Sequence, residues 1–353
     1  MNMHNVVSGV IGAGLFVGAM GIMSVGHATS NESSNAHEDH SHFQFGLWAD
    51  MPYAKNNDDP KVAALIEDIN STKLAFTIFG GDTKDGSSLC TDAAISTAPM
   101  ALFNQVRVPT MYVPGDNEWT DCHRKNNGGY NALERLSYIR QTLFASEKSF
   151  GQRKLDLEQQ GTPGGAYSEN TRWMYNGVMF VGLNVPGSNN NKVNAADCLS
   201  SKSVRTQVEC DADNAEYVDR TTHNLAWLKE SFELAKRNQS AGIMIVIQAD
   251  PGFDWPETET INERETLAGI DGYTDFLNTL TAETQAFDGQ VVLVHGDTHF
   301  FKIDKPLLSP TNVLKNFTRV EDFGSPNVHW IRVTVDSRSR NVFTFEPMIV
   351  PGN

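Results

Sequence analysis

Oxygen-bearing side chains gather just past the ends of several apolar segments of the chain. One stretch, VPGDNEWTDCH (113–123), offers Asp116, Asn117, Glu118 and Asp121 within six positions. Alone, such a stretch also fits an ordinary turn, because Gly, Asp and Asn tolerate tight and left-handed backbone. Five apolar segments, however, are followed by side chains of this kind. They are Asp50, then Asp82 and Asp85, then Asp116, Asn117 and Glu118, then Gln248 and Asp250, and finally Asp297 and His299.

Brought together, these side chains would form a metal site. In open α/β sheets, ligands bind beyond the carboxyl ends of the strands, so residues that follow successive parallel strands meet at one edge. Taken singly, Asp50 also fits a helix cap and His299 an ordinary partly buried histidine. Repeated carboxylates at one edge are costly unless a cation neutralises them. The repetition therefore indicates a cation site.

The segments that must position these residues alternate between strand and helix. Apolar runs predict strands at 43–49, 74–79 and 109–113, and helical spacing predicts helices at 60–69 and 93–106 between them. This alternation is the signature of parallel βαβ units. Further on, the pattern predicts helices at 131–145, 222–237 and 273–287, a hairpin at 173–185, buried strands at 243–247 and 291–294, and antiparallel strands at 328–335 and 342–345. We therefore expect one α/β domain over residues 43–353.

The N-terminal region is separate from this domain. Val6–Val25 is apolar and is followed by Gly26-His27-Ala28, which is similar to a small-residue cleavage site. We predict a signal peptide at 1–28, and export to the periplasm or the exterior without stable membrane insertion after cleavage. An uncleaved anchor is the alternative, because Met1–Asn5 lacks a basic residue. Residues 29–42, which contain three histidines, are polar and aperiodic and predict a disordered linker.

The four cysteines of the expected mature chain indicate disulfides. An even number of cysteines behind an export signal favours pairing, and four cysteines allow three pairings. We predict Cys90–Cys122 and Cys198–Cys210. The second pair lies in a polar segment at 187–219, which we predict to be a surface insertion that lines the pocket.

The charge balance excludes one class of partner. Lys and Arg number 28 against 43 acidic residues, which gives a net charge of −15. A chain of this charge repels polyanions and supplies few contacts that release counterions, so we expect no nucleic-acid partner.

The order of the motifs resembles that of the calcineurin-like metallophosphoesterases. That family carries Asp-x-His, Gly-Asp-x-x-Asp, Gly-Asn-His-Glu/Asp, a later His and Gly-His-x-His on loops after strands. Gly81–Asp85 (GDTKD) matches the second motif in full, and Asp50, Gly115, Glu118, Gly296 and His299 match parts of the others. The resemblance extends from about Phe43 to Phe345. It implies a four-layer αββα sandwich of two mixed β-sheets and the metal-dependent hydrolysis of a small phosphate mono- or diester.

Several positions depart from the family pattern. Pro52, Asn117 and Asp297 stand where the resemblance implies His, Asp116 replaces an Asn, and Gln248 or Ala249 replaces the fourth His. The predicted metal ligands are Asp50, Asp82, Asp116, Gln248, Asp297 and His299. Oxygen ligands favour magnesium, manganese or calcium over zinc. We expect one or two divalent cations, with Asp82 bridging two if both are present.

The departures also bear on catalysis. Asn117 is expected to bind the phosphoryl group, but its amide is a poor proton donor at neutral pH. His123 is the predicted general acid, and His295 is a second choice. The leading hypothesis is an exported metal-dependent phosphoesterase. The alternative is a degenerate member of the fold that binds a metal or ligand without turnover. The sequence carries no indication of the oligomeric state.

Overall fold

The computed structural model describes residues 41–252, 271–309 and 312–353. The chain divides into two units, Met1–Glu38 and Asp39–Asn353, and all described residues belong to the second. The predicted signal peptide and nearly all of the predicted linker therefore lie outside the described residues. Within the described ranges, every helix is too short or too polar to cross a membrane.

A five-stranded mixed sheet carries the N-terminal βαβ units, in the order β14-β13-β1-β2-β3. Its strands are β1 (His42–Trp48), β2 (Thr77–Phe79), β3 (Thr110–Tyr112), β13 (Trp330–Asp336) and β14 (Phe343–Met348). The strands β1, β2 and β3 are parallel, with Leu47 opposite Ile78 and Ile78 opposite Met111. The late strands β13 and β14 add to the edge beside β1 in antiparallel fashion, as the sequence predicted.

A seven-stranded mixed sheet follows the order β4-β5-β6-β7-β8-β12-β9. Its strands are β4 (Glu158–Gln159), β5 (Thr171–Tyr175), β6 (Val178–Gly182), β7 (Gly242–Val246), β8 (Gln290–His295), β9 (Lys302–Asp304) and β12 (Phe317–Glu321). The central strands β6, β7, β8 and β12 are parallel. The predicted hairpin is β5–β6, which turns at Asn176-Gly177. A separate pair consists of β10 (Leu308–Ser309) and β11 (Asn312–Val313).

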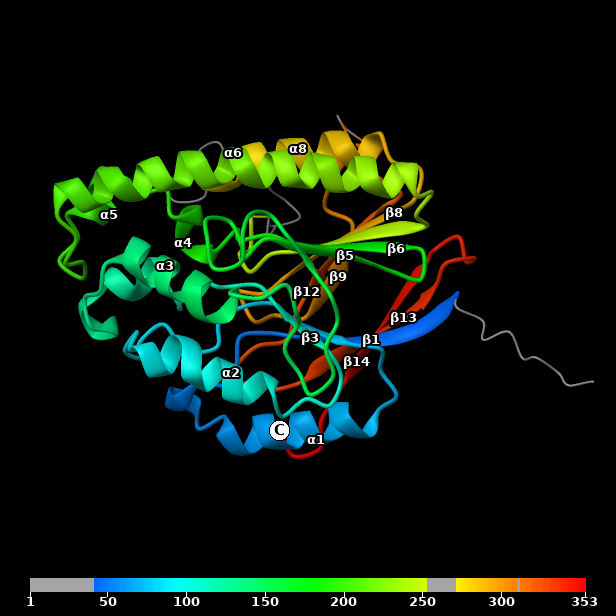
Figure 1. Cartoon of the computed structure of the whole chain (residues 1–353), viewed down its shortest axis with the longest axis horizontal. Coiled ribbons are helices and arrows are strands. Elements are labelled where there is room, and N and C mark those ends of the chain that lie inside the picture. Colours follow the sequence, from blue (N-terminus) through cyan, green and yellow to red (C-terminus); the bar gives the residue numbers. More distant parts are fainter. Residues whose placement is uncertain (1–40, 253–270, 310–311) are drawn as a thin grey trace, which may run out of the picture. The chain divides into compact units, whose positions relative to one another are not determined.

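Helices cover the outer face of each sheet (Figure 1). They are α1 (Asp59–Ser71), α2 (Ala98–Phe103) and α3 (Ala132–Leu143) on the first sheet, and α6 (Gln207–Arg237) and α8 (Thr274–Gln285) on the second. Apolar side chains from the inner faces fill the space between the sheets. There, Phe45 stacks on Phe76 at 4.9 Å and meets Phe180 of the second sheet edge-on at 5.3 Å. This confirms the predicted αββα sandwich of two mixed sheets.

Short helical turns lie in the connections between these elements. They are η1 (Ala54–Asn56), the π-turn η2 (Ala93–Thr97), η3 (Thr120–His123), η4 (Lys125–Asn127), α4 (Gly187–Asn190), α5 (Ala195–Cys198) and η5 (Asp271–Tyr273). The helix predicted at 93–106 consists of η2 followed directly by α2. It ends at Phe103, before the predicted end.

The prediction of a surface insertion at 187–219 is wrong in its second half. The helix predicted at 222–237 begins at Gln207 instead, so α6 has 31 residues. Its start is fixed by a capping box, in which Thr206 accepts from the backbone N–H of Glu209 and the Glu209 carboxylate accepts from Thr206. Cys210 and Asp213 are buried in this added part.

Both predicted disulfides are present, Cys90–Cys122 and Cys198–Cys210. They close loops of 32 and 12 residues, so in the chain-entropy model they stabilise the fold by about 4 and about 3 kcal/mol respectively.

We expect Cys90→Ala/Cys122→Ala to lower the free energy of unfolding more than Cys198→Ala/Cys210→Ala does, because the first disulfide closes the longer loop. Urea denaturation of the two double variants and the parent protein measures both losses. A larger loss from opening the shorter loop would show that chain entropy is not the main contribution of these disulfides.

Candidate metal centre

The predicted ligands lie at the carboxyl ends of the parallel strands of both sheets. Asp50 follows β1, Asp82 follows β2, Asp116 follows β3, Gln248 follows β7, and Asp297 follows β8. Because the two sheets face each other, these ends converge. Carboxylate oxygens of Asp82, Asp116 and Asp297 all lie within 4.8 Å of one another. The structure thus brings side chains that are over 200 positions apart in the sequence to one place.

Direct contacts add three more of the predicted residues to this cluster. The backbone N–H of Asp297 lies 3.3 Å from both carboxylate oxygens of Asp50, and His299 Nε2 lies 3.5 Å from Asp50 Oδ1. The Gln248 amide nitrogen donates to Asp297 Oδ1 at 3.2 Å, while its oxygen accepts from the backbone N–H of Gly187 at 2.6 Å. In this orientation the Gln248 oxygen faces the backbone, so its role as a metal ligand stays a prediction.

The cluster concentrates negative charge where water is excluded. Burial, and then the charge of Asp116, raise the pKa of Asp82 well above its ordinary value, and the same two causes raise the pKa of Asp297. Burial also raises the pKa of Asp50, although the hydrogen bond and charge of His299 oppose this. Burial, the largest single cause, lowers the pKa of His299, but the hydrogen bond to Asp50, the charge of Asp50 and the hydrogen bond to the Ser325 carbonyl together outweigh it and raise the pKa to about 9. A divalent cation would offset this repulsion, so the residues fit such a group.

The backbone around the cluster is held in a conformation that side chains rarely adopt. Asp50, Asp82, Asp297 and His299 have φ values of 54, 60, 76 and 64°. For a non-glycine residue this left-handed region costs roughly 1–2 kcal/mol. Four such residues in one cluster indicate that the surrounding structure fixes these loops for a purpose other than stability.

Two glycines allow the loops to approach this closely. A Cβ atom at Gly115 would lie 2.0 Å from Asp82 Oδ1, and one at Gly296 would lie 2.1 Å from Asp50 Oδ2. Any side chain at these positions would displace a carboxylate of the cluster.

The buried Glu118 joins the loops that follow β2 and β3. Its Oε1 accepts hydrogen bonds from the backbone N–H and the hydroxyl of Thr83, and its Oε2 accepts from the backbone N–H of Gly115 at 2.9 Å. Glu118 therefore fixes the loop positions of Asp82 and Asp116 relative to each other.

Comparison with known proteins shows the fold of the chain that carries this site. No family model matches the sequence, and no curated protein matches it. Among solved structures, PhoD aligns with a TM-score of 0.50 at 9% identity, over 88% of this chain and 67% of PhoD. The chain has the calcineurin-like metallophosphoesterase fold.

Two other solved structures align less closely. GAP50, the anchor in the inner membrane complex of Plasmodium, has a TM-score of 0.42 at 13% identity, over 88% of this chain and 90% of GAP50. A 5′-nucleotidase from Candida albicans has a TM-score of 0.37 at 12% identity, over 86% of this chain and 50% of the nucleotidase.

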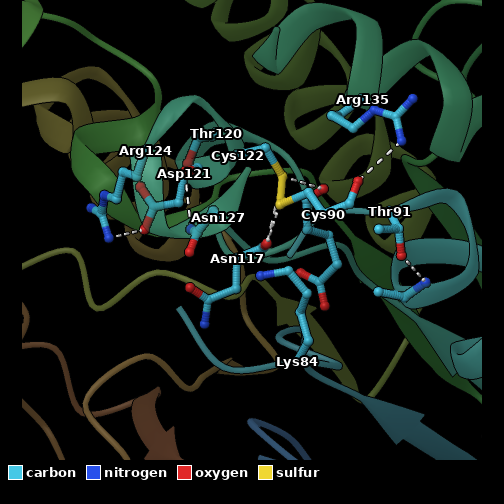
Figure 2. Close-up of a disulfide and its surroundings, with 12 residues drawn as sticks. Lys84, Cys90, Thr91, Asn117, Thr120, Asp121, Cys122, Arg124, Asn127 and Arg135 are labelled. Carbon is cyan, nitrogen blue, oxygen red and sulfur yellow. Dashed lines mark hydrogen bonds and ion pairs between the residues drawn. A yellow bond between two sulfur atoms is a disulfide. The ribbon is translucent and has the colours of Figure 1, made fainter. Parts of the chain in front are cut away.

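Within this metallophosphoesterase fold, Asn117 contacts the cluster directly. Its side-chain nitrogen donates to Asp82 Oδ2 at 2.6 Å and to the Tyr53 hydroxyl at 3.2 Å, and its backbone N–H donates to Asp82 Oδ1 at 3.2 Å. Figure 2 shows Asn117 beside the Cys90–Cys122 disulfide. The sulfur atoms of Cys90 and Cys122 lie 3.5 and 3.8 Å from the Asn117 carbonyl oxygen. The disulfide therefore restrains the loop that carries Asn117.

Tyr53 is a residue of the site to which the sequence assigned no role. Its hydroxyl donates to Asp82 Oδ2 at 3.1 Å and lies 3.3 Å from His299 Nε2. The signal was its position in the loop after β1, three residues past Asp50, next to the Pro that replaces a family histidine.

Ser188 is a second residue of the site that the sequence did not predict. It lies in an unusual turn that brings its hydroxyl to the cluster. Ser188, Asn189, Asn190 and Asn191 all have φ between 50 and 61°, which makes a left-handed turn. The Ser188 hydroxyl lies 2.9 Å from Asp116 Oδ2 and 2.7 Å from Asp121 Oδ1. The buried Arg220 of α6 holds the turn, donating to the Asn190 side-chain oxygen at 2.6 Å and to its carbonyl at 2.9 Å.

The structure places the predicted general acid elsewhere. His123 Nδ1 lies 3.0 Å from Ser203 Oγ, and among the described residues no hydrogen bond joins the imidazole to the carboxylate cluster. Burial, and then the positive charges of Arg205 and Arg124, lower the pKa of His123 to about 3. The ring is therefore neutral at pH 7 and carries no proton that a general acid would donate. His295 ends β8 on the outer side of the sheet, within 4.8 Å of Asp250 and Glu321.

Asp322 is a further buried carboxylate near Asp50 of the cluster. Asp322 follows β12, and among the described residues neither of its side-chain oxygens has a hydrogen-bond partner. Burial, and then the charge of Asp50, raise its pKa well above the ordinary value, which favours the protonated form. The sequence of β12 does not indicate a strand, so Asp322, unlike the residues after the other strands, is not marked by its position.

We expect the stability of the chelator-treated protein to fall as the pH rises from about 4 to 8. Asp50, Asp82 and Asp297 have raised pKa values when folded, so the folded state binds more protons than the unfolded state. Their contribution to stability is present below the unfolded pKa of about 3.9 and is lost as the pH rises through the folded values. Saturating Mg²⁺ or Mn²⁺ should restore about 3 kcal/mol at pH 8 at a concentration 100-fold above the dissociation constant.

Urea denaturation at pH 4.5 and 8, with and without the cation, measures both effects. Asp116→Ala should reduce the stabilisation by the cation, whereas Asp288→Ala, at an exposed aspartate, should leave it intact. Equal stabilisation of the parent and Asp116→Ala would remove Asp116 from the set of ligands.

Proposed function

We propose that the protein is an exported metal-dependent phosphoesterase that hydrolyses a small phosphate mono- or diester. The observation that carries the proposal is the convergence of Asp82, Asp116 and Asp297 within 4.8 Å, at the carboxyl ends of strands from both sheets. In α/β proteins this edge is where ligands bind. The metallophosphoesterase fold and the raised pKa values of the cluster support the same conclusion.

The side chains of the cluster determine which metal ion the site would bind. Asp50, Asp82, Asp116, Asp297 and His299 are the proposed ligands of one or two cations. Four carboxylates and a single imidazole favour magnesium, manganese or calcium over zinc. A bound cation of this kind supplies Lewis acidity, which makes water a nucleophile near neutral pH and stabilises the negative charge of the phosphate.

Asn117 and Tyr53 act beside this set in the proposed mechanism. The Asn117 amide holds both Asp82 and the Tyr53 hydroxyl, so its main role is to position them. The Tyr53 hydroxyl lies at the same edge and is a hydrogen-bond donor that reaches the cluster. We assign this O–H, which donates to Asp82 when no substrate is bound, to a phosphoryl oxygen of the bound substrate, in place of the histidine that the family carries and this chain lacks. His123, neutral and bonded to Ser203, is not given the role of general acid.

Export rests on the two disulfides. Disulfides form and persist in oxidising compartments such as the periplasm and the exterior. The predicted signal peptide lies outside the described residues, so it remains a prediction.

The direct test is the hydrolysis of a chromogenic phosphate monoester and diester by chelator-treated protein. Magnesium, manganese, calcium and zinc are added back separately. We expect turnover with an oxygen-preferring cation and a loss of at least about 100-fold, or about 2.7 kcal/mol in the barrier, in Asp82→Asn. Asp288→Asn, which changes an exposed carboxylate, is the matched control.

The alternative, a non-catalytic binder, has one observation in its favour. The Asn117 amide, which occupies the place of a family histidine, is already engaged by Asp82 and Tyr53. Stabilisation by a cation with no turnover of either ester would contradict the proposed activity and establish this alternative.

Tyr53→Phe should lower kcat/KM for the preferred ester by about 10- to 100-fold, since it removes one hydrogen bond to the phosphate in the transition state. Stabilisation by the cation should persist, because the phenol is not among the proposed ligands. Steady-state kinetics with Tyr138→Phe as the control checks this. Unchanged kinetics in Tyr53→Phe would assign the hydroxyl to positioning Asp82 alone.

A further inference from the structure

A cavity of about 840 Å³ lies directly beside the carboxylate cluster. Two segments line it, one at 121–126 after β3 and one at 188–205 before α6. Asp121 and Ser188 belong to its lining, and the Ser188 hydroxyl lies 2.9 Å from Asp116 Oδ2. A molecule whose reacting phosphate sits at the cluster would therefore place an adjoining part in this cavity.

The charge of the cavity is opposite to that of the chain. Its lining contains five cationic side chains against two carboxylates, although the whole chain has a net charge of −15. The cationic residues are Arg124, Lys125, Lys192, Lys202 and Arg205, and the acidic ones are Asp121 and Asp197. Such a local reversal of sign attracts anions to one place on an otherwise repelling protein.

Three of the five cations already have partners. Arg124 pairs with Asp121, Arg205 with Asp213 at 2.7 Å, and Lys192 with Asp271 at 2.5 Å. These pairs fix the wall of the cavity.

The other two cations, Lys125 and Lys202, have no ion pair among the described residues. The backbone N–H of Lys125 donates to the carbonyl of Lys202 at 2.9 Å, so two ammonium groups start from adjacent backbone. Both lysines line the cavity, so an anion bound there would meet two cations that lack an ion pair.

The wall that carries Lys202 is held in place before any ligand binds. The Cys198–Cys210 disulfide closes this segment, and a β-bridge joins Arg124 to Ser203. A preformed wall lowers the entropy that is lost on binding. The volume is within the range of small-molecule sites.

A second cavity, of about 1190 Å³, is also lined by cations, but none of its lining residues belongs to the carboxylate cluster. There, Lys236 pairs with Glu233 and Glu283, and Lys305 donates to the backbone carbonyls of Lys315 and Phe317. Lys315 and Arg340 of the same lining have no ion pair among the described residues, so what distinguishes this cavity is its place: its lining shares no residue with the carboxylate cluster.

We infer that the cavity at 121–126 and 188–205 binds a second anionic group of the substrate, a phosphate remote from the ester that is hydrolysed. The inference rests on the proposed function for the reacting phosphate and adds the substrate class, a molecule with two phosphate groups. Lysine ammonium groups together with an arginine fork suit phosphate oxygens.

The first test measures binding alone, so it does not depend on turnover. Inorganic tripolyphosphate is titrated into the chelator-treated full-length protein by calorimetry at low salt. We expect Lys125→Ala/Lys202→Ala to raise Kd at least tenfold, and added salt to weaken binding by the parent protein. The control, Lys73→Ala/Lys229→Ala, removes the same charge from two exposed lysines outside the cavity and should leave Kd within twofold.

The second test compares 1,4-butanediol bisphosphate with butyl phosphate as substrates of the metal-loaded protein. The ratio of their kcat/KM values should favour the bisphosphate at least tenfold in the parent protein. In Lys125→Ala/Lys202→Ala this ratio should fall towards one, whereas the control keeps it. Melting temperatures verify that both double variants are folded.

The outcomes separate the cavity from the catalytic site. Failure to hydrolyse any ester, with tripolyphosphate binding that depends on Lys125 and Lys202, would overturn the proposed function and retain the anion site. Absence of tripolyphosphate binding, or equal losses in the two double variants, would overturn the anion site whatever the activity.

Discussion

The repulsion among four carboxylates at the junction of the two sheets is the constraint on which the site depends. Asp50, Asp82, Asp116 and Asp297 could be kept apart by small shifts of their loops, yet the structure holds them together. Three of these residues, with His299, lie in the left-handed region of backbone space, and a buried glutamate ties two of their loops. Each device adds cost or rigidity that a carboxylate cluster without a ligand would not need.

The sandwich supplies the rigidity that this arrangement requires. Because β1, β2 and β3 are parallel in one sheet and β7 and β8 are parallel in the other, their carboxyl ends open toward the same space. The aromatic packing of Phe45 and Phe76 against Phe180 fixes the separation of the sheets. The disulfide at Cys122 then restrains the one loop that carries both Asp116 and Asn117. Core packing and site geometry are therefore consequences of the same topology.

Looking for polar residues directly after apolar strands predicts most of the cluster, because buried parallel strands are continuous apolar runs that are easy to recognise. It failed where the strand itself is polar. β12 (FTRVE) contains Arg319 and Glu321, so its pattern does not indicate a buried strand. For this reason Asp322, which directly follows β12, was not predicted as part of the site. The first part of α6 failed for a related reason. It buries Arg220, which donates to the Asn184 carbonyl 36 positions earlier, although the capping box at Thr206 and Glu209 was readable.

The contacts that sequence reasoning could not supply are those that cross between loops. Tyr53 stands next to a substituted histidine, but nothing in its neighbours shows that its hydroxyl reaches Asp82, 29 positions later. Net charge misleads in the same way. A value of −15 argues against a polyanion partner, yet it hides five cations that converge on one cavity from two segments about 65 positions apart. Only the folded backbone brings Arg124 opposite Ser203, and with it Lys125 beside Lys202. The distribution of charge, rather than its sum, determines which anions such a protein would accept.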